Sequence, residues 1–200
     1  LLARRVRAIQ SIVQVPFLLE TNVYYFTFPD SDLDEAAFLN RLCAEAGCGL
    51  LLDVHNVYAN ARNHDFDAEA FLSRLDLSHV REIHTAGGME FDGFYLDAHS
   101  GRTSPEVWDL LEWSVRRAPN LCGIVFELFR DWVPDVPESS LLEELARLRE
   151  VWKHRPTPAL KECDDGPVPG HARPTGDRRR VRGSGPQTGQ GGAAARANRA

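Results

Sequence analysis

The feature that most constrains this chain is the short apolar run at residues 49–52, which ends on Asp53. An apolar run of this length, placed just after the helix breaker Gly47, predicts a strand buried on both faces, as in parallel sheets. The Asp53 carboxylate stands where that strand stops. In β/α barrels the carboxyl ends of the strands are where ligands and catalytic groups lie. Asp53 is therefore the first candidate for a functional residue.

Three more apolar segments end on a side chain that can bind a metal ion. The segments with their last residues are 15–20 with Glu20, 80–84 with His84, and 121–127 with Glu127. Because the carboxyl ends of parallel strands meet at the same edge of a sheet, we expect these four terminal side chains to converge. A lone acid at a strand end is often only a helix cap, so the recurrence carries more weight than any single residue.

Segments with helical periodicity separate the predicted strands. One occupies the first 14 residues, and the others follow Asp32, Asp67, Ser104 and Pro137. Asp32 with Glu35 three residues later has the pattern of a capping box. Residues 58–65 are predicted to be a polar loop and residues 85–101 a long functional loop, and no β-hairpin is expected.

This alternation predicts an α/β fold, a partial TIM-type (β/α) barrel of about four βα units. A doubly wound sheet is the alternative, but no Gly-rich phosphate loop follows any strand. A closed barrel needs about 250 residues, and the chain begins with Leu1, which suggests an incomplete sequence. We expect residues 1–154 to form the C-terminal part of a metal-binding barrel domain. Residues 155–200, rich in Pro, Gly and Arg, are expected to be a disordered tail.

Charge and cysteine content narrow the class of protein. Nine Lys+Arg and four Asp+Glu after position 154 leave −11 on the preceding residues, out of −6 for the chain. An acidic body argues against nucleic-acid binding, and no apolar stretch approaches the ~18 residues of a membrane span. The four cysteines form no CxxC pair and indicate no disulfide framework, so a cytoplasmic location is expected.

Asp97-Ala98-His99 adds a second source of metal-type side chains. In an extended segment, residues two apart point the same way, so Asp97 and His99 could hold one cation together. Carboxylates gathered without cations would repel one another, and some would stay protonated. Oxygen and nitrogen donors without thiolate fit Fe, Mn or Zn, and several carboxylates favour more than one ion.

Three neighbours of these residues are candidates for supporting roles. Asn56 could bind a metal through its amide oxygen or orient a ligand. His55 has the parity of Asp53, although the strand is expected to have ended there. Glu82 lies two residues before His84 on the same predicted face, where it could form an ion pair or orient the imidazole.

Five segments resemble one known family over about residues 10–152. They read FLLETN, GLLLDVHNVY, REIHTAG, LDAHSGRTSPEVWDLL and IVFELFRDWVPD, and they are similar in order and spacing to the multinuclear non-heme iron-dependent oxidative enzymes, long catalogued as a domain of unknown function. The resemblance implies a TIM-type barrel whose C-terminal mouth holds two or three irons. It also implies a set of iron ligands, which are Glu20, Asp53, His84, Asp97, His99 and Glu127, with Asn56 at a position that is Asn or His in the family.

The chain departs from the family in two places. The first strands of the family barrel, which supply further histidine ligands, are absent from this sequence. The usual Glu-Asn pair is here Glu20-Thr21-Asn22, so the supporting amide of Asn22 is displaced by one residue.

The resemblance implies an iron-dependent oxidase that uses dioxygen to rebuild residues, plausibly cysteine, of a ribosomally made precursor peptide. A small partner protein that presents the peptide is implied as well. Two alternatives stay open from the residues alone. One is a divalent-metal isomerase or hydrolase of the xylose-isomerase-like barrel type. The other is an inactive barrel fragment or scaffold, since half a barrel exposes the edges of its outer strands.

Overall fold

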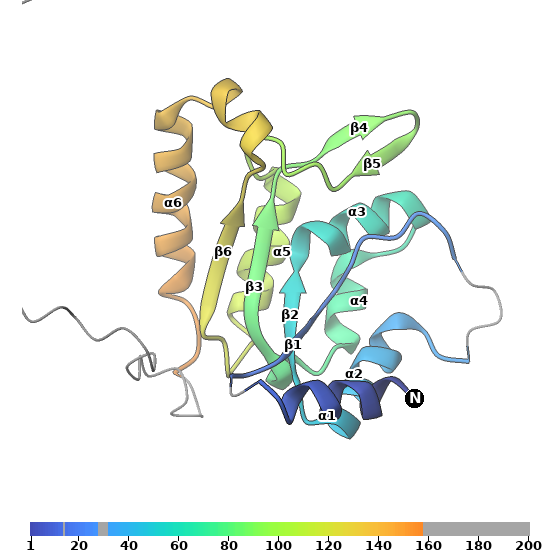
Figure 1. The fold of residues 1–200 in the computed structure, drawn as a ribbon. Coiled ribbons are helices and arrows are strands. Elements are labelled where there is room, and N and C mark those ends of the chain that lie inside the picture. Colours follow the sequence, from blue (N-terminus) through green and yellow to red (C-terminus); the bar gives the residue numbers. More distant parts are fainter. Residues whose placement is uncertain (14, 28–31, 158–200) are drawn as a thin grey trace, which may run out of the picture. The chain divides into compact units, whose positions relative to one another are not determined.

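Four parallel strands form the centre of the molecule. The computed structural model describes residues 1–13, 15–27 and 32–157. The sheet has the order β1-β2-β3-β6 (Figure 1), and its strands are β1 Leu18–Glu20, β2 Gly49–Asp53, β3 Val80–Ala86 and β6 Gly123–Glu127. Parallel strands joined by helical crossovers confirm the predicted α/β class and the partial TIM-type barrel of about four βα units.

Helices connect the strands and flank the sheet, with α5 behind β3 and α6 beside β6 (Figure 1). Their bounds are α1 Leu2–Gln10, α2 Glu35–Ala46, α3 Val54–His64, α4 Ala68–Arg74, α5 Pro105–Val115 and α6 Glu138–Trp152. Short 3-10 helices span Leu77–His79 and Arg130–Asp135. Of the six α-helices in the described residues, five lie where periodicity predicted one, and the sixth, α3, replaces a predicted loop.

Side-chain caps explain where several helices begin. Ser104 accepts a hydrogen bond from Val107 N at the start of α5, and Asp67 accepts one from Ala70 N at the start of α4, as the sequence predicted. For α2 the predicted cap Asp32 is wrong. Asp34 accepts from Ala37 N over 3.0 Å instead, and its second oxygen lies 3.1 Å from Arg74 Nη1, a partner that the sequence alone does not reveal.

Helix α3 corrects the prediction of a polar loop at residues 58–65. The helix begins directly after Asp53, whose side chain accepts from Asn56 N and so caps it. Several of its polar residues are buried rather than solvated: Asn60 donates to Asn22 O and accepts from Tyr24 N, both over 2.9 Å. The polar character that suggested a loop belongs to a helix face that binds the neighbouring backbone.

A β-hairpin, which the sequence was not expected to contain, lies in the long loop after β3. Strands β4 Met89–Phe91 and β5 Phe94–Leu96 pair antiparallel. The turn residues Asp92 and Gly93 have φ values of 49° and 81°, the left-handed conformations of a two-residue hairpin turn that Asp-Gly favours. The Asp-Gly dipeptide was the signal that could have predicted the hairpin.

The two faces of the sheet differ in burial. Leu50, Leu52 and Ile83 are 2%, 0% and 0% exposed and pack into the hydrophobic core under the helices. On the opposite face Leu51 is only partly buried and Val125 is 38% exposed. The prediction that β2 is buried on both faces is therefore wrong for the described residues. The core lies on one side, and the other side is the inner face of the partial barrel.

Three expectations concern the rest of the chain. Most of the predicted disordered tail, residues 158–200, lies outside the described residues. Among the described helices, none is both long and apolar enough to cross a membrane. Cys43 and Cys48 are free and buried.

Replacing Leu52 by Ala should cost about 2 to 5 kcal/mol in free energy of unfolding, because it opens a cavity in a fully buried site. Leu142→Ala is the matched control, since Leu142 on α6 is 59% exposed, and it should cost less than about 0.5 kcal/mol. Urea unfolding of both variants measures the difference. Equal losses would contradict the one-sided core.

Candidate metal centre

Strand register explains how acids and imidazoles far apart in sequence come together. Asp53 lies opposite His84, Glu20 opposite Leu51, and Glu127 opposite Ala86. Because alternate residues of a strand share a face, these pairings put Glu20, Asp53, His84 and Glu127 on the same inner face near the carboxyl ends of their strands. The structure thus brings together the four strand-end residues that the sequence singled out.

Two overlapping groups have the spacing of metal ligands. Glu20, Asp53 and His84 each offer one donor atom, and these atoms lie within 4.8 Å of one another. The same limit holds for Asp53, His99 and Glu127. Asp53 belongs to both groups, so its two carboxylate oxygens suit a position between two cations.

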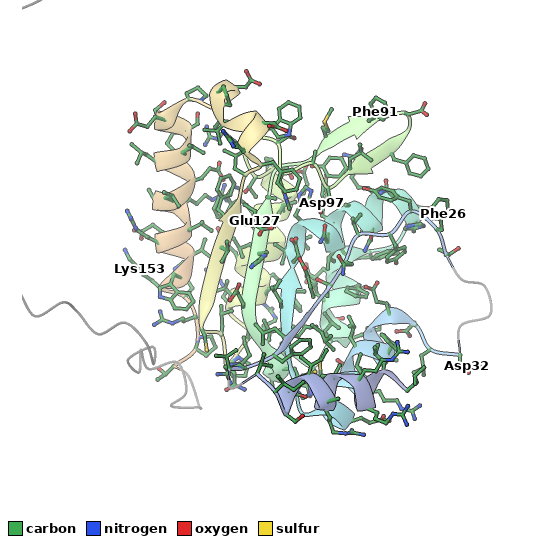
Figure 2. The ribbon with its side chains drawn as sticks, in the orientation of Figure 1. Phe26, Asp32, Phe91, Asp97, Glu127 and Lys153 are labelled. Atoms are coloured by element: carbon green, nitrogen blue, oxygen red, sulfur yellow. The ribbon has the colours of Figure 1, made fainter. Side chains whose placement is uncertain are left out.

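Direct contacts join the remaining members of the cluster. Glu127 lies between two imidazoles, with Oε1 3.3 Å from His84 Nδ1 and Oε2 3.3 Å from His99 Nε2. His99 Nε2 is also 3.1 Å from Asp97 Oδ1. Figure 2 labels Asp97 and Glu127 close to the carboxyl ends of β3 and β6. The side chains aim at a common volume rather than away from one another.

Asp97 and His99 meet for a different reason from the one predicted. They do not lie in an extended strand: the loop turns at Ala98, whose N–H donates to Leu96 O over 3.0 Å, and His99 has a φ of 46°. Left-handed backbone is unfavourable for a residue with a Cβ and persists only where surroundings enforce it. Phe129 supplies part of that restraint, because its N–H donates to His99 O over 3.1 Å and its ring packs edge-on against the imidazole.

Unpartnered buried polar atoms gather in this cluster. Among the described residues, the site side chains with buried atoms that lack a hydrogen-bond partner are Asp53 (Oδ2), His55 (Nδ1 and Nε2), Asn56 (Oδ1), His84 (Nδ1), Asp97 (Oδ1) and His99 (Nδ1 and Nε2). Leaving such an atom unsatisfied costs roughly 1 to 3 kcal/mol. Concentrated carboxylate, amide and imidazole atoms of this kind fit metal ions, which would occupy their free lone pairs.

The pKa values of the carboxyl groups also favour a site for cations. The pKa of Asp53 is raised to about 7, chiefly by burial and also by nearby Asp97 and Glu20, against the lowering effect of the hydrogen bond from Asn56 N–H. Partial desolvation raises the pKa of Glu20, which is otherwise an exposed residue, and burial raises that of Asp97; Glu127 adds to both shifts. The carboxylates therefore resist being charged together, and positive charge at their centre would relieve that repulsion.

Two residues that the sequence offered for supporting roles, Glu82 and His55, lie beside the cluster. Glu82 Oε1 is 2.7 Å from His84 Nε2, which turns His84 Nδ1 towards the cluster, an arrangement common around metal-binding histidines. His55 is fully buried with Nε2 3.7 Å from Asp97 Oδ1. Burial, with a smaller effect of His99, lowers the pKa of His55 to about 4, so the ring is neutral at pH 7.

Asn22 is not brought to the site, and Thr21 stands in its place. Asn22 is exposed and contributes its backbone carbonyl to Asn60. Thr21 is 1% exposed, and its hydroxyl accepts from Asp53 N over 2.9 Å and donates to Asp53 O over 3.3 Å. Thr21 O also accepts from Asn56 Nδ2 over 3.1 Å, leaving the Asn56 amide oxygen free. The position of Thr21 next to Glu20 was the only feature of the sequence that could have indicated that Thr21 holds the backbone of Asp53.

Comparison with known proteins places these residues in a family context. The model of a family described as the RiPP precursor modification enzyme MbnB/TglH/ChrH matches residues 1–153. A UPF0276 protein of Bordetella parapertussis is 41% identical over 144 residues, which are 70% of this chain and 48% of that protein. A UPF0276 protein of Neisseria meningitidis serogroup B is 37% identical over 164 residues, which are 80% of this chain and 56% of that protein. The chain thus spans about half the length of the curated relatives it matches.

Thr21→Val should lower the free energy of unfolding by about 1 to 3 kcal/mol, because a valine of the same shape leaves the buried Asp53 backbone groups without their hydroxyl partner. Thr27→Val, at an exposed position, is the control and should change it by less than about 0.5 kcal/mol. Urea unfolding compares them. Similar changes in the free energy of unfolding for both variants would show that the Thr21 hydroxyl does not stabilise the backbone at Asp53.

Asp53→Asn should have opposite effects without and with metal. Asn caps helices as well as Asp, and removing a carboxyl whose pKa burial raises to about 7 should leave metal-free stability equal or higher. Added Co²⁺ or Mn²⁺ should raise the Tm of the wild type but raise that of the variant much less. Asp109→Asn, at an exposed position on α5, should respond to metal as the wild type does.

Thermal unfolding with and without each metal gives the result. An unchanged metal response in Asp53→Asn would mean that the cations bind elsewhere.

Proposed function

The chain belongs to the RiPP precursor modification enzymes of the MbnB/TglH/ChrH family, and we propose that it acts as a multinuclear, iron-dependent oxidase. Its substrate in this proposal is a ribosomally made precursor peptide, of which it modifies residues, with cysteine as the first candidate. Dioxygen is the cosubstrate. Membership in a family of precursor modification enzymes supports the peptide as substrate and supports an enzymatic role.

The observation that carries the proposal is the cluster of buried, unpartnered donor atoms at the carboxyl ends of the strands. The seven proposed ligands are Glu20, Asp53, Asn56, His84, Asp97, His99 and Glu127. They offer oxygen and nitrogen atoms and no thiolate, a donor set that suits non-haem iron. Two overlapping groups that share Asp53 support two cations or more. Bound iron would supply the one-electron chemistry and the activation of dioxygen that side chains lack.

The chain's own residues have separate tasks in this proposal. Glu82 orients His84 through its ring nitrogen, and Thr21 fixes the backbone at Asp53. His55 stands beside Asp97 as a neutral imidazole. The exposed ring of Phe129, which contacts His99, walls the side from which a peptide could approach.

A partner protein belongs to the proposal as well. The resemblance to multinuclear iron oxidases implies a small protein that presents the peptide. The inner face of the sheet, where Val125 is 38% exposed and Leu51 only partly buried, is open in the described residues. Such a surface leaves room for further protein around the mouth.

The proposal is tested with the full-length protein, prepared without oxygen and loaded with Fe²⁺. Elemental analysis and Mössbauer spectroscopy should find two or more irons per chain. A precursor peptide encoded beside the gene, when supplied with oxygen, should change mass in a way that requires both iron and dioxygen. Glu127→Gln removes one charge from between the two imidazoles and should lower iron content and product together.

Two results would point elsewhere. Stoichiometric zinc with no oxygen consumption would favour a hydrolase, and activity with Mg²⁺ or Mn²⁺ alone would favour an isomerase, because the same oxygen and nitrogen donors also suit those ions. A protein that binds no metal would be a scaffold and not an oxidase.

A further inference from the structure

Helix α6 buries a carboxylate where its apolar stripe should continue. Glu144 is 2% exposed and lies on one face with the buried Leu148 and Val151. Leu142 and Leu145 on the same helix are instead 59% and 42% exposed. A buried charge is costly unless it is well paired, and an apolar side chain at such a site is often as stable or more so. Glu144 therefore calls for a role beyond helix packing.

The partners of Glu144 lie on the loop that carries Asp97 and His99. Its Oε1 is 2.9 Å from Arg102 Nε, and its Oε2 accepts from Thr103 N over 3.4 Å. Arg102 lies three residues after His99, and Nη1 of the same guanidinium reaches the exposed Glu143 Oε2 over 2.9 Å. One buried carboxylate thus holds two consecutive residues of the loop.

The other side of this loop is pressed against the end of β3. A Cβ on Gly87 would stand 2.7 to 2.8 Å from the carbonyl oxygens of Ser100, Gly101 and Arg102, closer than such atoms pack. Ser100 N donates to Gly87 O over 2.8 Å. The loop is therefore fixed between Gly87 on the strand side and Glu144 on the helix side.

We propose that Glu144 is a positioning residue for the metal centre. By holding Arg102 and Thr103, it keeps the loop in the turn that places His99 in left-handed backbone with Nε2 3.3 Å from Glu127. A carboxylate is suited to this task because its two oxygens accept from two donors at once, and pairing with Arg102 strengthens the contact. This inference rests on the proposed function, since it assigns Glu144 to the same metal site.

The test compares Glu144→Gln with Glu143→Gln in the full chain. Both remove one negative charge next to Arg102, but Glu143 is 62% exposed at its side chain and Glu144 is 2% exposed. Co²⁺ titration followed by visible absorption reports both affinity and ligand geometry. Glu144→Gln should weaken Co²⁺ binding on the order of tenfold, at the low end for residues that orient ligands, and should change the absorption intensity. Glu143→Gln should bind Co²⁺ as the wild type does.

Three outcomes would overturn the inference. If Glu144→Gln unfolds at a lower temperature yet keeps the wild-type Co²⁺ affinity and spectrum, Glu144 serves packing alone. An equal loss in both variants would indicate a general charge effect. Failure of the wild type to bind Co²⁺ would remove the metal centre itself, and the proposed function with it.

Arg102→Lys covers the case in which Glu144→Gln does not fold. Lysine keeps the charge but cannot donate to Glu143 and Glu144 from one planar group, so it should weaken Co²⁺ binding and alter the spectrum in the same direction. Wild-type binding by this variant would count against the inference.

Discussion

The pairing of the parallel strands, which decides the side chains on the inner face of the sheet, is the constraint on which the rest of this structure depends. Side chains alternate along each strand, and the pairing of Asp53 with His84 and of Ala86 with Glu127 sets which residues stand side by side. Asp53 is the residue at which most of these structural requirements meet. It ends β2, caps α3 through one oxygen, and belongs to both groups with metal-ligand spacing through its carboxylate. The change from strand to helix at one residue is what allows α3 to supply His55 and Asn56 to the same place.

The side chains that would bind metal ions at this site lower the stability of the metal-free protein. Burial brings the pKa of Asp53 to about 7, and neighbouring carboxylates raise the pKa values of Glu20 and Asp97 further. Protonation can relieve the repulsion, but it leaves His99 Nδ1 and the amide oxygen of Asn56 without a partner. Cations satisfy both requirements at once, because they neutralise the acids and accept lone pairs from the other atoms. On the proposed function, the arrangement is costly without cations and becomes favourable when they bind.

Much of the fold and of the candidate site could be predicted from the sequence, because both follow from local patterns. Short apolar runs that end on an acid or a histidine predicted the strands and their converging ends, and Ser104 and Asp67 predicted helix starts that the structure has. The failures have physical causes as well. The polar residues of α3 suggested a loop because their partners, such as the backbone of Asn22 and Tyr24, are distant in sequence. The hydroxyl of Thr21 and the carboxylate of Glu144 act through tertiary hydrogen bonds, and no periodicity indicates which backbone group a side chain will meet. The Asp92-Gly93 turn, by contrast, was a local signal that was missed.

The candidate site is supported in two ways that differ in rigidity. Glu20, Asp53, His84 and Glu127 are fixed by strand pairing, which cannot shift by one residue without turning every side chain to the opposite face. Asp97 and His99 instead belong to a turn whose geometry depends on contacts from outside it, with Gly87 and Phe129 on one side and α6 on the other. Loss of those contacts would leave the strand-borne ligands in place while the loop-borne ligands move. It follows that the group Glu20, Asp53 and His84 should hold a cation independently of the loop, whereas the group that includes His99 requires the loop to be held. In the proposed metal centre, the position that includes His99 is therefore the one that depends on the contacts from helix α6.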